Sequence, residues 1–469
     1  MATVCKAQAS EIASLKNTIE ELKELMTDHI TTTSKPTTLK NTAIITTTTP
    51  VTTTTIMTTT TTVYEPPVIF SIYGQAGGTT TAGNVISFTE YFVNIGNSMT
   101  SDTFNVPYTG LYEMSFFVSS YDMNSKIEVK KNGNVEFSIY SEKLSWANFG
   151  TTWLMNLNQN DSIQLFVSTG QIYSNTNVGK MFNGRRITHY QDRTIFSVMS
   201  NVGGSITAGN YIDFDQILVD GGNHFKENLG LFTVPRDATF EFSFSGNSYD
   251  TFTVVDVLKN DIKIISFSSS AKLYSVLGCT WILEMKKNDK LQLKVNTGSI
   301  YATASLYRIF NGIELSNNLD FEPEFFSAIR TNEVTFSTKS YLTFEKFLVS
   351  NDNFDLSKGE LTTSVPGIYA FSMSMNVGST HGTIRLCKNG DCDTIECYTN
   401  GQSWSSLRCN WKMQLTAGDK IRLNVDQGTI QTHEERNLIF NGKLLVPDLY
   451  LQKSMKNSNV TYQPVMTND

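Results

Sequence analysis

The sequence is poor in charge and has no excess of basic residues. Only 17% of its 469 residues are charged, and 37 lysines and arginines are set against 44 aspartates and glutamates, a formal net charge of −7. A chain without a positive field has little to hold a phosphate backbone or an anionic membrane surface, so neither nucleic acid nor membrane is an expected partner. No run of about 18 apolar residues occurs, which excludes a membrane-spanning helix.

Catalytic motifs are also absent. The chain has no G-x-S-x-G, no H-E-x-x-H, no phosphate-binding glycine-rich loop before a helix, and no placed carboxylate pair. We therefore expect no enzyme activity and assign no cofactor. The histidines stand apart from any nucleophile motif; they are His29, His189, His224, His381 and His433.

The N-terminal residues lack the apolar segment of a secretion signal. Residues 1–16 instead carry charged side chains, so export is not predicted from them. Over residues 1–30 apolar side chains alternate at steps of three and four, which predicts a short coiled coil; a surface amphipathic helix is the alternative. The apolar positions are Ile12, Leu15, Ile19, Leu22 and Met26.

Residues 31–63 are dominated by threonine and interrupted by Pro36 and Pro50. Such a tract has nothing with which to build a core, so we interpret it as a disordered stalk or linker. Outside the cell it would be an O-glycosylated spacer, and inside the cell a plain linker.

The rest of the chain contains an internal repeat. Phe-Asn-Gly begins at Phe182, Phe310 and Phe440, which lie 128 and 130 residues apart, and the same offsets relate three tryptophans. A period of this length is that of a whole domain, so we predict three tandem copies of one fold, at 64–187, 188–315 and 316–447, with a tail at 448–469. The tryptophans are Trp153, Trp281 and Trp411.

The apolar residues of each copy alternate with a period of two. Ile163-Gln-Leu-Phe-Val and its equivalents place branched residues on one face, as a half-buried strand requires. Lys-Asn-Gly between apolar runs, as at Lys131, signals a tight hairpin because Asn-Gly adopts positive φ readily. Many short strands without a convincing helix predict an all-β sandwich for each copy.

The aromatic spacing of the middle copy resembles the signature of the C1q domain family. Segments 106–112 and 365–371 of the other copies supply the Gly and Tyr that the family expects where the middle copy has Ala238 and Phe240. The middle copy carries the signature at Phe214, Asp220, Phe225, Phe232, Ala238, Phe240, Phe242 and Phe244.

The resemblance implies a fold, a mode of action and a location. It implies ten-stranded antiparallel jelly rolls like those of C1q and the tumour-necrosis-factor-like proteins, which trimerise through apolar faces and act by binding. It also implies an extracellular protein of innate recognition, with the coil and the threonine tract in the position of the family's stalk. Some members hold calcium near the trimer axis, so carboxylates in turns are candidate calcium ligands here. An ordinary role in stabilising the turns is the favoured alternative. The candidate carboxylates are Asp220, Asp250 and Asp352.

Four of the six cysteines lie in the third copy. If Asn389-Gly390 forms a two-residue turn, Cys387 and Cys392 face each other one pair beyond the closing pair, where a cross-strand disulfide is possible. A zinc site is a weaker alternative because the spacing is not that of paired C-x₂-C knuckles. Cys279 and Cys409 each lie two residues before a Trp and are expected to be small buried hydrophobic residues.

Three positions have meaning only in an exported protein. Cys5 lies at a seam position of the predicted coil, where it is a candidate interchain thiol or else a free one. Asn160 and Asn459 are N-glycosylation acceptors by sequence.

Two assemblies follow from three copies of a trimerising fold. Either the copies close on one another as a pseudo-trimer within one chain, or each copy trimerises with its counterparts in two other chains to form a rod. The connectors at 185–194 and 313–324 reach roughly 30–40 Å at about 3.3 Å per residue, which permits closure. We expect a multivalent binding protein that engages glycans, microbial surfaces or a receptor; a structural component that acts by multimerising is the alternative.

Overall fold

The chain divides between Thr62 and Val63 into two units, and the computed structural model describes residues of the second unit alone. The predicted coil and threonine tract therefore lie outside the described residues. The described ranges are 67–74, 78–120, 124–141, 147–174, 179–202, 204–249, 252–270, 274–303, 307–315, 324–377, 381–392, 396–399 and 405–452.

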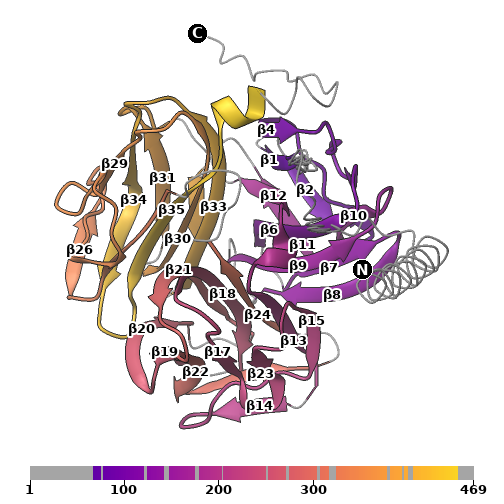
Figure 1. Cartoon of the computed structure of the whole chain (residues 1–469), viewed down its shortest axis with the longest axis horizontal. Coiled ribbons are helices and arrows are strands. Elements are labelled where there is room, and N and C mark those ends of the chain that lie inside the picture. Colours follow the sequence, from indigo (N-terminus) through magenta and orange to yellow (C-terminus); the bar gives the residue numbers. More distant parts are fainter. Residues whose placement is uncertain are drawn as a thin grey trace, which may run out of the picture. The chain divides into compact units, whose positions relative to one another are not determined.

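The three repeats are all-β, as predicted from the two-residue period (Figure 1). The first comprises β1 (Ile69–Gly74), β2 (Gly78–Thr81), β3 (Asn84–Val85), β4 (Glu90–Ile95), β5 (Phe104–Asn105), β6 (Gly110–Ser120), β7 (Lys126–Lys131), β8 (Asn134–Tyr140), β9 (Asn148–Leu157), β10 (Ser162–Thr169), β11 (Gln171–Ser174) and β12 (Lys180–Ile187). The second comprises β13 (Ile195–Ser200), β14 (Gly204–Thr207), β15 (Gln216–Asp220), β16 (Phe225–Lys226), β17 (Leu231–Thr233), β18 (Ala238–Ser248), β19 (Val254–Lys259), β20 (Ile262–Ser268), β21 (Val276–Met285), β22 (Lys290–Thr297), β23 (Ser299–Ala302) and β24 (Arg308–Glu314). The third comprises β25 (Phe325–Arg330), β26 (Val334–Ser337), β27 (Lys346–Val349), β28 (Phe354–Asp355), β29 (Glu360–Thr362), β30 (Gly367–Val377), β31 (Gly382–Lys388), β32 (Glu396–Thr399), β33 (Ser405–Leu415), β34 (Lys420–Thr432) and β35 (Leu438–Pro447).

Each repeat is a sandwich of two antiparallel sheets with the same strand order. The inner sheet runs β9-β6-β12-β1-β4 in the first repeat, β21-β18-β24-β13-β15 in the second and β33-β30-β35-β25-β27 in the third. The outer sheet is built around β10, β22 and β34. Sequential strands cross between the two sheets, which is the jelly-roll arrangement that the sequence predicts.

The outer strands confirm the predicted alternation. Along β10, Ile163, Leu165 and Val167 are buried, and the residues between them are partly exposed. The hairpin turns also match, because Asn132-Gly133 and Asn389-Gly390 both adopt positive φ at the two turn positions. Local sequence is therefore sufficient to shape the outer sheet.

The inner strands differ from this pattern. Every described residue of β6 is buried, and β18 and β30 are buried almost throughout, although polar and apolar residues alternate along them. One face covers the sandwich core, which contains Trp153, Trp281 and Trp411 with no exposed surface. The other face is covered by the neighbouring repeats, as the contacts below show.

Two features lie outside the sandwiches. Short 3₁₀ turns occur at Tyr190–Asp192 and Glu227–Leu229. None of the helical segments among the described residues is long and apolar enough to span a membrane.

Candidate functional site

The asparagine of each Phe-Asn-Gly motif bonds to a neighbouring repeat. The side-chain amide of Asn183 donates to the backbone oxygen of Asn410 (3.3 Å), that of Asn311 to Thr152 (2.8 Å), and that of Asn441 to Thr280 (2.8 Å). The first repeat thus bonds to the third, the third to the second, and the second to the first. Because the acceptor always directly precedes the repeat's tryptophan, the three contacts are equivalent and close a ring.

A serine orients each of these asparagines. The hydroxyls of Ser71, Ser197 and Ser327 each donate to the asparagine Oδ1 of their own repeat at 2.6 Å. This bond fixes the amide so that its Nδ2 faces the neighbour, and every asparagine is at least 98% buried. The motif that reveals the repeat in the sequence is therefore also a contact between repeats, a role that the spacing alone does not disclose.

Apolar side chains cross the same boundaries in the same direction. Each repeat places three side chains from equivalent positions in the hydrophobic core cluster of its neighbour, so the three cores are continuous with one another. The first repeat places Tyr73, Phe92 and Met181 in the cluster of the third. The second places Met199, Leu218 and Ile309 in the cluster of the first, and the third places Ile329, Leu348 and Ile439 in the cluster of the second.

A buried ion cluster, which we call the axial cluster, joins all three repeats. Glu113 of the first repeat pairs with Arg185 and lies 3.6 Å from the Lys443 ammonium of the third. Lys443 also pairs with Glu241 of the second repeat. Lys412 completes the cluster, and all five side chains belong to residues that are at most 9% exposed.

The cluster shifts the ionisation of its members. Burial alone would raise the pKa of Glu113, but the charges of Arg185, Lys443 and Lys412 outweigh it and hold that pKa well below its usual range. Burial lowers the pKa of Lys412 to about 7, and Lys443 and Arg185 add to this effect, whereas Glu113 opposes it. Glu113 is therefore ionised, and Lys412 is the member whose charge burial opposes most strongly.

The equivalent axial positions carry different residues in the three repeats. The position after each Trp is Leu154, Ile282 and Lys412, and the position after each Phe-Asn-Gly is Arg185, Ile313 and Lys443. A third axial position is occupied by Glu113 in the first repeat, Glu241 in the second and Ala370 in the third. Three copies of the second repeat would thus bury three glutamates without a cation, and three copies of the third would bury six lysines without a carboxylate. Three copies of the first repeat, with Glu113 and Arg185, would be balanced, but the second and third repeats approach charge balance only against a different repeat.

Arg408 shows the same complementarity by shape. Its guanidinium, in a residue 5% exposed, donates to the backbone oxygens of Gly150 (2.9 Å) and Phe244 (3.4 Å) in the two other repeats. The equivalent position is glycine in both of those repeats, Gly150 and Gly278. A Cβ at Gly278 would collide with Arg408 and with the Phe244 backbone. One arginine and two glycines therefore fill a space that three arginines could not share.

Comparison with known proteins agrees with this geometry. The family model of the C1q domain matches three times, at residues 69–185, 195–315 and 325–445. The chain belongs to the C1q domain family. This confirms the resemblance noted in the sequence, and the C1q family supports a general role in recognition or assembly for the chain.

Two solved structures are similar to parts of this C1q-family chain. The globular domain of zebrafish complement 1qA protein is 20% identical, and the match covers 27% of this chain and 99% of that one, with a TM-score of 0.24. A triple jelly-roll protein of an archaeal virus turret is 10% identical over 80% of this chain and 89% of that one, with a TM-score of 0.19.

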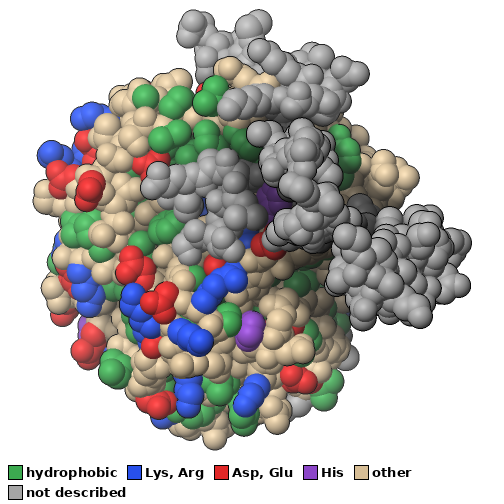
Figure 2. All heavy atoms as spheres, viewed as in Figure 1, with side chains coloured by type: hydrophobic (Ala, Val, Ile, Leu, Met, Phe, Trp, Pro, Cys, Tyr) green, Lys and Arg blue, Asp and Glu red, His purple; other side chains and the backbone are tan. Residues whose placement is uncertain are grey.

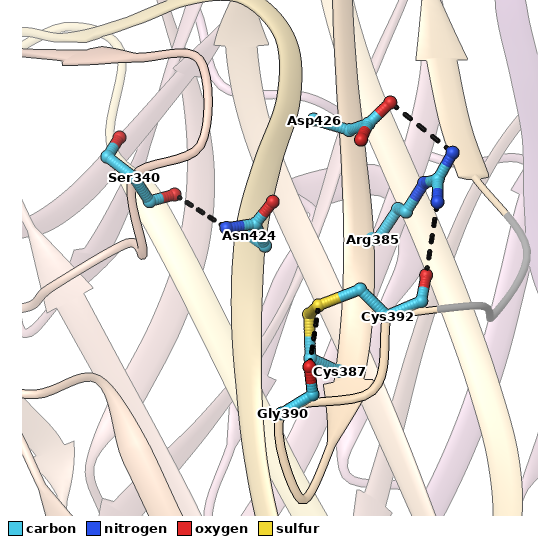
Figure 3. Close-up of a disulfide and its surroundings, with 7 residues drawn as sticks. All are labelled: Ser340, Arg385, Cys387, Gly390, Cys392, Asn424 and Asp426. Atoms are coloured by element: carbon cyan, nitrogen blue, oxygen red, sulfur yellow. Dashed lines mark hydrogen bonds and ion pairs between the residues drawn. A yellow bond between two sulfur atoms is a disulfide. The ribbon is translucent and has the colours of Figure 1, made fainter.

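In the third repeat Cys387 and Cys392 form a disulfide that closes the hairpin at Asn389-Gly390 (Figure 3). Lys388 and Asp391 exchange both backbone hydrogen bonds and form the closing pair, so the cysteines are the next, non-hydrogen-bonded pair, with Cα atoms 4.1 Å apart. Arg385, on the same strand as Cys387, donates to the backbone oxygen of Cys392 (3.4 Å), which is a further bond across the hairpin.

The expectation for Cys409 is wrong. It is buried, but it forms a disulfide with Cys397 rather than packing as a free thiol. Cys397 lies on β32 of the outer sheet and Cys409 on β33 of the inner sheet, so the bond ties the two layers together. Cys279 at the equivalent position of the second repeat is buried and free, as expected, and burial raises the pKa of its thiol to about 12.

We expect peptide mapping of the unreduced native chain to recover Cys387–Cys392 and Cys397–Cys409 as linked pairs. Cys279 should react with an alkylating reagent after unfolding and not before, because its thiol is buried and protonated. Mass spectrometry before and after denaturation measures both, and Cys279 is the internal control. Alkylation of Cys397 or Cys409 in the unreduced chain would contradict the pairing.

The remaining predicted positions have no shared site. Asn160 lies exposed in a turn with φ 72°, accessible to a glycan, whereas Cys5, Asp250 and Asn459 lie outside the described residues. Asp220 accepts a backbone hydrogen bond from His224, and Asp352 is exposed. Among the described residues no three histidine, cysteine or acidic side chains gather in a way that could hold a metal ion, so the structure offers calcium no such group.

The outer surface offers a groove in the second repeat. It has a volume of about 560 Å³ and is lined by hydroxyl, amide and carboxylate side chains beside Tyr211, whose exposed fraction is 39%. Asp213 at its edge holds Arg308 through a 2.7 Å ion pair. The first repeat has Val85 in place of Tyr211 and Ser87 in place of Asp213, whereas the third repeat keeps a tyrosine, Tyr341, but has Thr343 in place of Asp213. On the face shown in Figure 2 basic and acidic side chains intermingle, without a broad area of one sign.

Proposed function

We propose that this chain is a C1q-type recognition protein whose binding unit is complete within one chain. The axial cluster supports this most directly, because the axial charges of the second and third repeats are balanced only by those of a different repeat. The C1q trimer, normally made from three chains, is here replaced by three linked and unequal domains.

Unequal domains change what such a unit can bind. A homotrimer repeats one surface three times, whereas this chain presents three different outer surfaces, of which the second carries the groove at Tyr211. Hydroxyl, amide and carboxylate groups beside an exposed aromatic ring suit a polar ligand such as a glycan, on a microbial surface or a receptor. We place the protein outside the cell, where disulfides and an N-glycan at Asn160 are stable.

Light scattering tests the assembly. A fragment from Tyr64 to Leu445 should have the mass of one chain, because its axial surfaces are already covered by its own repeats. The full-length chain should be larger if the predicted coil gathers several units for avidity. A fragment with the mass of three chains would overturn the proposal in favour of a rod of stacked trimers.

Ligand binding is tested on the full-length chain with arrays of glycans and intact microbial surfaces. Tyr211→Ala should reduce binding of a positive glycan at least fivefold while the circular dichroism stays unchanged. Ile262→Ala, at a residue 71% exposed on β20 and outside the groove, is the matched surface control. Assembly that is ligand-free and lost in Cys5→Ser would favour the structural alternative.

A further inference from the structure

A second pocket lies where the three repeats meet and is lined by cations. Arg185 and Arg186 reach it from the first repeat, Arg193 from the segment that enters the second, and Lys443 from the third. Its other lining residues are apolar or uncharged, and none is acidic. A partly buried pocket with four positive side chains attracts an anion.

Arg185 is the best placed of these cations. The residue is 9% exposed, and its Nε pairs with Glu113, whereas its Nη2 is buried without a hydrogen-bond partner. A buried guanidinium N–H without an acceptor costs free energy that an incoming oxygen would recover. The planar fork of arginine matches the paired oxygens of carboxylate and phosphate groups.

The axial cluster, which shares Arg185 and Lys443 with the pocket, carries more cations than carboxylates. Glu113 and Glu241 are the only carboxylates of the axial cluster, and Lys443 pairs with both of them. Arg186 donates to the Thr109 backbone oxygen at 2.9 Å, which is a neutral acceptor. Two carboxylates therefore stand against three buried cations of the axial cluster, Arg185, Lys412 and Lys443.

The pocket's size limits what it can hold. Its cavity volume of about 40 Å³ has room for a few water molecules, each of which needs about 10–15 Å³ by this measure. That space suits one small oxyanion and is too small for a sugar chain. The apolar walls at Leu444 and Leu445 exclude competing water on one side.

We propose that this pocket binds a small oxyanion, a phosphate-sized or carboxylate group held by Arg185, Arg193 and Lys443. Such an ion contacts side chains from all three repeats or their connectors, so its binding stabilises the closed arrangement of the repeats. The site is distinct from the groove at Tyr211 and does not depend on any ligand bound there.

Titration of the full-length chain with inorganic phosphate, and separately with acetate, tests the site. At constant ionic strength, calorimetry should show one site per chain for at least one of the two anions, and thermal unfolding should shift upward with its concentration. No binding of either anion at concentrations up to tens of millimolar would overturn the proposal.

Arg185→Lys tests whether the anion is bound by this arginine or only attracted by the general positive charge. It keeps a cation beside Glu113 but removes the Nη2 fork, so affinity should fall at least tenfold with little change in unfolding without anion. Arg236→Lys is the control, because Arg236 also pairs with a buried glutamate, Glu314, but does not line the pocket. Equal affinity in Arg185→Lys and the wild type would overturn the proposal. If Arg185→Lys fails to fold, Arg193→Lys serves with the same expected loss.

Discussion

Lys443→Met is expected to lower the free energy of unfolding by about 3–5 kcal/mol, the usual cost of removing one partner from a buried ion pair. Lys443 is 6% exposed and is, among the described residues, the cation that pairs with both Glu113 of the first repeat and Glu241 of the second. Methionine preserves the length of the side chain but leaves Glu241 buried without its cation. Urea unfolding of the full-length chain, followed by tryptophan fluorescence, measures the change because all three axial boundaries lie beside a buried tryptophan.

Two further variants show whether the loss comes from the charge. Lys420→Met removes an exposed pair with Glu360 and should cost less than about 1 kcal/mol. Adding Glu241→Gln to Lys443→Met should restore part of the stability, because the uncompensated carboxylate is gone. A Lys443→Met chain as stable as the wild type would mean that the repeats do not meet at this cluster.

Much of the fold was predictable because its determinants are local. The period of two along β10, the positive φ of Asn-Gly turns and the spacing of Cys387 and Cys392 each depend on neighbouring residues or on a single hairpin. The offset between Phe-Asn-Gly motifs likewise needed no knowledge of contacts. These features predict three β-sandwich domains, and the jelly roll and the family follow from the resemblance of the aromatic spacing to the C1q signature.

The axial cluster could not be predicted in the same way. In a single repeat, Glu113 and Lys412 occupy positions that alternate with core residues, so a half-buried strand would expose them to water. Only the packing of a second and a third repeat converts that face into an interior. The error at Cys409 has a different origin, since its equivalence to Cys279 suggested one environment for both, whereas the partner Cys397, 12 residues away on the preceding strand, has no cysteine counterpart in the second repeat.

That reasoning also leads to a substitution that stabilises the protein. Lys412→Leu places in the third repeat the type of residue that the other two have at this position, Leu154 and Ile282. Among the described residues the Lys412 ammonium makes no hydrogen bond and no ion pair within 4 Å, and burial lowers its pKa from 10.5 to about 7. The gain should be about 3–5 kcal/mol at pH 7, since each pKa unit corresponds to about 1.4 kcal/mol.

The pH dependence identifies the cause. Between pH 7 and 10 the unfolded chain keeps the Lys412 proton that the folded chain has lost, so wild-type stability should rise with pH across that window. Below pH 7 lysine is protonated in both states and the full penalty remains. The stability difference between Lys412→Leu and the wild type should therefore be largest at pH 7 and below, and should shrink towards pH 10. Arg408, whose pKa burial lowers to about 10, contributes equally to both chains and cancels in this difference.

Lys420→Leu, which removes a lysine with a 55% exposed side chain, is the control and should show neither the gain nor the slope. Urea unfolding at pH 6, 7, 8 and 9 measures all three chains. A Lys412→Leu variant less stable than the wild type at pH 7 would contradict the prediction. It would show that the ammonium is paired in solution, with Glu113 and Glu241 as the carboxylates of its cluster. A gain that fades with pH would instead show that the third repeat carries a buried charge that its two counterparts have replaced with an apolar side chain.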